Sequence, residues 1–137
     1  MRRLIHAIAI SALAAATATV AHSAPTLIYK VDRVSAAIVR NHLVVSASGA
    51  VKSGGWTLPR LHMKEAHVPE SNTEVIEFQA TPPVSDSAVI QALLPIQTTA
   101  TFPLPRYGAV QVTVVAQTNS VTAPIDFHPQ QPPARGR

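Results

Sequence analysis

The chain has 137 residues, a formal net charge of +4 and no cysteine. Removing Arg2 and Arg3 from its 11 Lys and Arg leaves 9, against 7 Asp and Glu, so the rest of the chain is close to neutral. A nearly neutral domain lacks the clustered basic face that nucleic-acid binding requires. Because the chain has no cysteine, thiol catalysis and disulfides are excluded. The length is sufficient for one domain with a hydrophobic core.

Residues 1–21 have the pattern of a secretory signal peptide. Arg2 and Arg3 give a cationic start, Leu4 to Leu13 form a short apolar stretch, and small residues lead up to Ala21. We therefore expect cleavage after Ala21 and export to the periplasm or the extracellular space.

Two alternatives to this cleavage remain. Cleavage after Ala24 fits less well, because His22 would then occupy a position that favours a small side chain. An uncleaved membrane anchor is disfavoured because the apolar stretch is short. No later apolar run is long enough to span a membrane, so we expect no stable membrane insertion after cleavage.

The remaining pattern is that of short β-strands. Alternating or β-branched runs predict strands at 26–31, 35–39, 42–51, 56–63, 73–80, 87–102, 109–117 and 120–127. Residues expected to face the core are Leu43, Val45, Ala47, Ile76, Phe78, Ala80, Val110, Val112, Val114 and Ala116. Turn residues separate these runs, so the sequence predicts an all-β fold, namely an immunoglobulin-like antiparallel β-sandwich of seven to eight short strands over residues 22–127. The Pro-rich residues 128–137 are predicted to be a disordered tail.

The stretch SGGWTLPRLHM, residues 53–63, contains the only tryptophan. A strict alternation from Trp56 would bury Arg60, whereas one extra residue near Pro59 turns Trp56 and Leu58 inward before it and Leu61 and Met63 after it. We therefore expect a β-bulge near Pro59, with Arg60, His62 and Lys64 facing water. A core position for Trp56 is favoured over a solvent-facing one that stacks on sugar.

A strand that ends in SGAVKSGGWTLPRL, followed by IEFQATPP and VTVVAQTNSV, resembles a group of small exported bacterial β proteins. The resemblance extends over most of the chain after the signal peptide. It implies export and a β fold, and it carries neither a function nor a site residue.

The histidines offer two candidate metal sites. Cleavage after Ala21 would make His22 the first residue, and its amine and imidazole could together chelate Cu(II). A third nitrogen would have to come from His42, His62, His67 or His128. His62 and His67 could also converge with Glu65 on one loop, although surface histidines usually have no ligand.

Enzymatic motifs are missing from the sequence. There is no G-x-S-x-G serine motif, and the acidic residues Glu65, Glu70, Glu74 and Glu77 read as a solvated loop rather than as a glycosidase pair. We therefore expect no catalytic residues, and no cofactor unless Cu(II) binds. The sequence predicts a small exported non-catalytic binding protein whose partner is another protein or an envelope component. A copper-binding protein that uses His22 is the alternative, and a small hydrolase is a weaker one.

Overall fold

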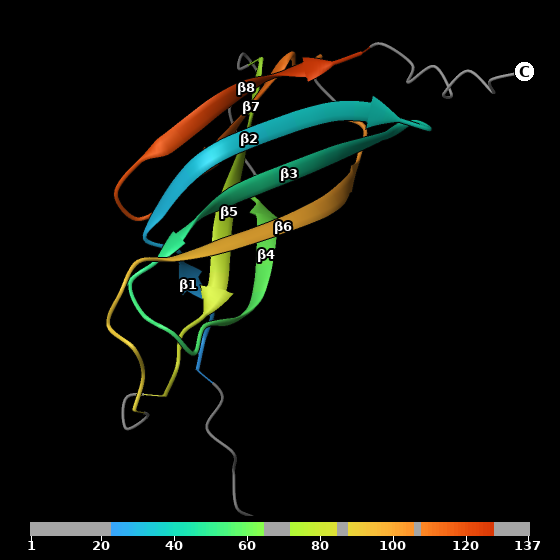
Figure 1. The fold of residues 1–137 in the computed structure, drawn as a ribbon. Helices are drawn as coiled ribbons and strands as arrows, with labels where there is room; N and C mark the ends of the chain where they lie inside the picture. The colour runs from blue at the N-terminus through green and yellow to red at the C-terminus, as the bar shows by residue number, and fades with distance from the viewer. Residues whose placement is uncertain (1–22, 65–71, 85–87, 106–107, 128–137) are drawn as a thin grey trace, which may run out of the picture.

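The computed structural model describes residues 23–64, 72–84, 88–105 and 108–127, and in these ranges every regular element is a β-strand (Figure 1). The strands are β1 (Thr26–Leu27), β2 (Lys30–Val39), β3 (His42–Val51), β4 (Thr57–Met63), β5 (Thr73–Thr81), β6 (Leu94–Pro103), β7 (Gln111–Val115) and β8 (Ser120–Asp126). The predicted all-β fold with seven to eight strands is confirmed. The predicted signal peptide 1–21 and the predicted tail 128–137 lie outside the described residues. Within the described ranges, no helix is long and apolar enough to cross a membrane.

The strands form one curled sheet, a half-barrel. Its order is β1-β5-β7-β8-β2-β3-β6, with β4 on the other edge of β5. Strand β8 joins the two halves, because it pairs with β7 along its length and with β2 near its end. In Figure 1 the half made of β2, β3 and β6 lies in front of the half made of β4, β5 and β7. The curl brings β6 over β4, where the Thr98 hydroxyl donates to the Pro59 carbonyl at 3.3 Å.

The sheet is mixed, which corrects the prediction that all strands pair antiparallel. Strand β2 runs parallel to β8, with Ala36 beside Ile125, and β5 runs parallel to β7, with Ile76 beside Val114. After β5 the chain crosses to the other half to form β6 and then returns to place β7 beside β5. The alternation of apolar residues shows which face of a strand is buried, but it carries no information on the direction of the neighbouring strand.

The core lies between the two halves and is built from the alternating positions. Its largest fully buried side chains are Phe78, Ile28, Leu43, Ile76, Val31, Val45, Val112 and Val114. Nine of the ten predicted core positions are buried, and the exception is Val110, which is 49% exposed. Strand β7 begins one residue after Val110, whose N–H bonds to the Asn72 carbonyl, and Ala109 is the buried residue instead.

Two local features fix how β2 joins its neighbours. Its register against β3 shifts between Val31 and Arg33, which is a β-bulge at Asp32. On the opposite edge the Asn119 side chain replaces a strand: its Oδ1 accepts from Val31 N at 2.9 Å and its Nδ2 donates to Val31 O at 2.7 Å. The predicted turn before β8 therefore also satisfies the backbone of a residue in β2.

Candidate functional site

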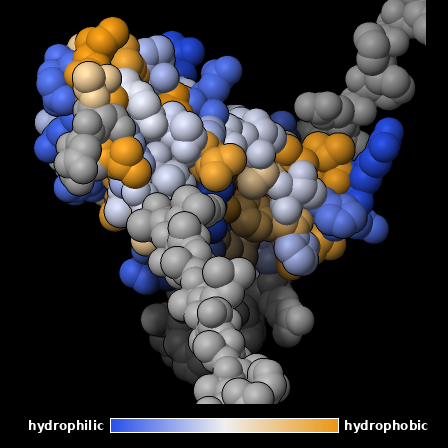
Figure 2. All heavy atoms as spheres, turned by 90° about the horizontal axis from the view of Figure 1, so that it is seen from below, coloured by the Kyte–Doolittle hydropathy of each residue, from blue (hydrophilic) through white to orange (hydrophobic). Residues whose placement is uncertain are grey.

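The loops at one end of the half-barrel enclose an open apolar groove. The described chain enters this end at Ser23, and the connections β3–β4 and β5–β6 meet there (Figure 1, bottom). A hydrogen bond of 2.8 Å from Gly54 N to Ile90 O ties these two connections together. Figure 2 faces this end and shows hydrophobic side chains reaching the surface among polar ones, beside a hollow. The groove holds about 700 Å³, and its apolar walls are Pro25, Leu58, Pro82, Pro83, Val84 and Val89.

Leu58 is the most exposed of the large hydrophobic side chains in the described ranges. Its exposed fraction is 75%, and Ile90, Leu93 and Val84 on the facing connection are 71%, 56% and 57% exposed. Leu58 also has a φ of 52°, in the left-handed region, which costs a residue with a side chain about 1–2 kcal/mol. This strained conformation turns the Leu58 side chain out of the core and onto the rim of the groove.

A β-bulge produces this conformation. Thr57 pairs with Thr81 and Arg60 pairs with Gln79, so that two residues of β4 lie opposite the single Ala80 of β5. The bulge predicted near Pro59 is therefore confirmed. So are the inward positions of Leu61 and Met63 and the outward positions of Arg60, His62 and Lys64. The prediction that Leu58 points inward is wrong, because the φ reversal at Leu58 itself inverts the direction of its side chain.

Gly55 allows the two connections that form the groove to approach each other closely. Its φ of 81° suits glycine, and a Cβ at this position would lie 2.9 Å from Cβ of Pro83 and 3.0 Å from Cγ1 of Val89. The two connections can therefore approach closely only because Gly55 has no side chain.

Trp56 anchors the β3–β4 connection to the core. Its ring is half-buried and packs against the core cluster, and its Nε1 donates to the Ser53 hydroxyl at 3.2 Å. Ser53 in turn donates to the Gly54 carbonyl at 3.1 Å. Trp56 is therefore a structural residue, as predicted, but it is less buried than a core position implied.

A polar network lies on the outer face of β4 and β5, next to the groove. Arg60 donates to the Gln79 Oε1 atom from Nε at 3.0 Å and from Nη2 at 2.7 Å. The Gln79 amide donates to Glu77 at 2.8 Å, and Glu77 also forms an ion pair with Lys64 at 3.8 Å. Among the described residues the side-chain partner of the Arg60 guanidinium is the neutral Gln79, so a positive charge lies at the rim of the groove.

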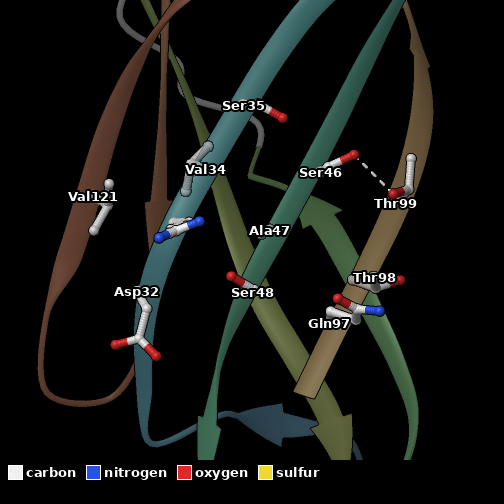
Figure 3. A pocket seen from close by; sticks show the side chains of 11 residues that line it. Asp32, Val34, Ser35, Ser46, Ala47, Ser48, Gln97, Thr98, Thr99 and Val121 are labelled. Atoms are coloured by element: carbon white, nitrogen blue, oxygen red, sulfur yellow. Dashed lines mark hydrogen bonds between the residues drawn. The ribbon is translucent and has the colours of Figure 1, made fainter. Parts of the chain in front are cut away.

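A second hollow of about 810 Å³ lies over β2, β3 and β6 (Figure 3). Hydroxyl and amide side chains line it together with the charged Asp32 and Arg33, and the hydroxyls of Ser46 in β3 and Thr99 in β6 bond to each other at 2.8 Å. Unlike the apolar groove, this hollow has no strained residue and no exposed large hydrophobic side chain in its described lining. We therefore take the apolar groove as the candidate site.

The residues predicted for metal binding are not brought together where the structure describes them. His42 begins β3 and donates from Nδ1 to the Arg40 carbonyl at 2.9 Å, whereas His62 lies on the outer face of β4. Among the described residues no group of three or more His, Asp or Glu side chains could hold an ion. His22, His67 and His128 lie outside these residues, so the chelate at His22 stays a prediction.

The sequence did not indicate the apolar groove. Residues 87–102 were predicted to be one extended segment, but β6 begins only at Leu94, so that Ala88 to Leu93 belong to a connection. The available signal was that Val89, Ile90 and Leu93 follow a few residues after Pro82 and Pro83, in a place where a connection usually carries polar residues.

No protein-family model, no curated protein and no solved structure matches the chain.

Proposed function

We propose that the protein is a small exported, non-catalytic binding protein, and that its apolar groove holds an apolar segment of another protein. One observation carries the proposal: Leu58 is held outward, 75% exposed, by a strained backbone at the rim of that groove. A residue strained toward solvent costs free energy without contributing to the core, and such strain concentrates at functional sites.

The lining of the groove defines the chemistry of the partner. The walls are aliphatic and proline side chains, which favour an apolar segment. Arg60 at the rim, bonded to the neutral Gln79, favours a carboxylate on that segment. We therefore expect the bound segment to be apolar with one acidic residue.

Display of a random peptide library on the purified protein tests this function. Enriched peptides should share apolar residues and an acidic one, and their binding should be lost in Leu58→Asp. The matched control is Leu104→Asp, because Leu104 is also an exposed leucine, at 45%, but lies outside the groove. Enriched peptides that bind wild type and Leu58→Asp equally would refute the site.

Vesicles distinguish a membrane from a protein as the partner. Co-sedimentation with phosphatidylcholine and phosphatidylglycerol vesicles that Leu58→Asp abolishes, without peptide enrichment, would replace the protein partner by a lipid surface.

The finer predictions, an immunoglobulin-like packing of the two halves and a signal peptide at residues 1–21, stay predictions, as does the copper alternative at His22.

A further inference from the structure

Strand β6 forms an end of the sheet and leaves one backbone edge unpaired by a neighbouring strand. It pairs with β3 along all of its length, from Leu94 to Pro103, and no other strand among the described residues pairs with it. Within the described ranges, no loop backbone forms a hydrogen bond with Gln97, Thr99 or Thr101. An edge of this kind is a template for a further strand.

The direction of the backbone groups of β6 follows from the pairing. Val31 directs its N–H and C=O to Asn119, away from β3, so the Val31–Gly49 pair exchanges no hydrogen bonds. In the antiparallel alternation Gly49 then bonds to its other partner, Ile96, whose groups point toward β3.

Backbone groups alternate in direction along a strand, so those of the residues next to Ile96, and of every second residue beyond, point away from β3. Gln97, Thr99 and Thr101 therefore direct their N–H and C=O to the open edge. Pro95 and Pro103 agree with this assignment, because a proline has no N–H to donate and fits edge positions at which that N–H would face outward.

The open edge is symmetric about Thr99. Pro95 and Pro103 are equally distant from it along the chain, and so are Gln97 and Thr101. We propose that β6 pairs antiparallel with β6 of a second copy of this chain, with the two-fold axis at Thr99.

This register gives each outward N–H of β6 a carbonyl partner. Thr99 pairs with Thr99 of the second copy and Gln97 with Thr101, and each such pair exchanges two hydrogen bonds. Pro95 lies opposite Pro103, so the two residues of β6 that have no N–H face each other.

The side chains of β6 are compatible with this pairing on both faces. No residue of β6 is charged, so the like charges that usually protect an edge strand are absent from it. On the inner face the same register places Ile96 of one copy opposite Phe102 of the other. Both side chains are partly exposed in the single chain, and an aromatic side chain opposite a β-branched one stabilises paired strands.

Sedimentation velocity of the purified protein over a wide range of concentration tests the pairing. Wild type should dimerise with rising concentration, and Thr99→Pro should remain monomeric, because it removes the N–H at the axis from both copies. Thr99→Val is the matched control: it loses the same hydroxyl bond to Ser46 but keeps the N–H, and it should dimerise. A monomeric wild type, or a dimer that persists in Thr99→Pro, would overturn the proposal.

Charge pairs test the register, and they remain informative should Thr99→Pro fail to fold. In Gln97→Lys with Thr101→Lys, like charges lie opposite each other twice, which should weaken the dimer about tenfold. In Gln97→Lys with Thr101→Glu, opposite charges meet instead, and the dimer should be as stable as wild type or more so. Equal dissociation of both double variants would overturn the register.

Discussion

Asn119 gives the sharpest test of how the two halves are joined. Its amide makes both hydrogen bonds to the backbone of Val31, which is 1% exposed, at 2.9 and 2.7 Å. In Asn119→Ala the N–H and C=O of Val31 lose their partners. An unsatisfied buried polar group costs about 1–3 kcal/mol, and because the site is only part-buried, water limits the sum for both groups to about 2–4 kcal/mol.

Urea unfolding followed by the fluorescence of Trp56, the only tryptophan, measures this loss. The control is Thr118→Val, which removes the neighbouring exposed hydrogen bond from the Thr118 hydroxyl to the Tyr29 carbonyl, at 2.7 Å, and should change stability by less than about 0.5 kcal/mol. Asn119→Asp should also destabilise, since a carboxylate accepts from Val31 N but repels Val31 O. If Asn119→Ala unfolds within about 0.5 kcal/mol of the control, the side-chain clamp does not hold β2.

Five further outcomes are expected. Gly49→Ala should prevent stable folding, measured by far-UV circular dichroism, because its Cβ would overlap the Lys30 carbonyl. Phe78→Ala should cost about 3–5 kcal/mol in urea unfolding, as for other fully buried phenylalanines, whereas a loss under about 1 kcal/mol would contradict the packed core. Intact mass of exported material should show a chain beginning at His22, and any Cu(II) binding seen by calorimetry should be weak and lost when a glycine precedes His22. Deletion of residues 128–137 should change stability by less than about 0.5 kcal/mol, and a larger loss would show that the tail packs on the sheet.

Burial pattern was the part of the fold that the sequence predicted well. The period of two in β3 and β5 placed Leu43, Val45, Ile76 and Phe78 in the core, because each strand of the half-barrel has one covered face. The bulge in β4 was predictable for the same reason, since without it Arg60 would have been buried.

Features that depend on distant partners were not predictable. The parallel pairs β2–β8 and β5–β7 depend on how the chain crosses between the two halves, which alternation does not encode. The exposure of Leu58 depends on one backbone angle, and leucine itself gives no signal of a positive φ. The groove therefore depends on the contact between the connections β3–β4 and β5–β6, which are distant in the sequence.

The clamp between Asn119 and Val31 has a consequence for how the chain folds. The two residues are 88 positions apart, so β2 can be satisfied on its outer edge only after nearly the whole described chain has been synthesised. Closing so long a loop must precede the contacts that reward it, which makes folding slow relative to proteins with local contacts. A ribosome-bound chain that ends before β8 would therefore remain unfolded, and we expect protection from proteolysis to arise in one step, once residues 119–126 are available.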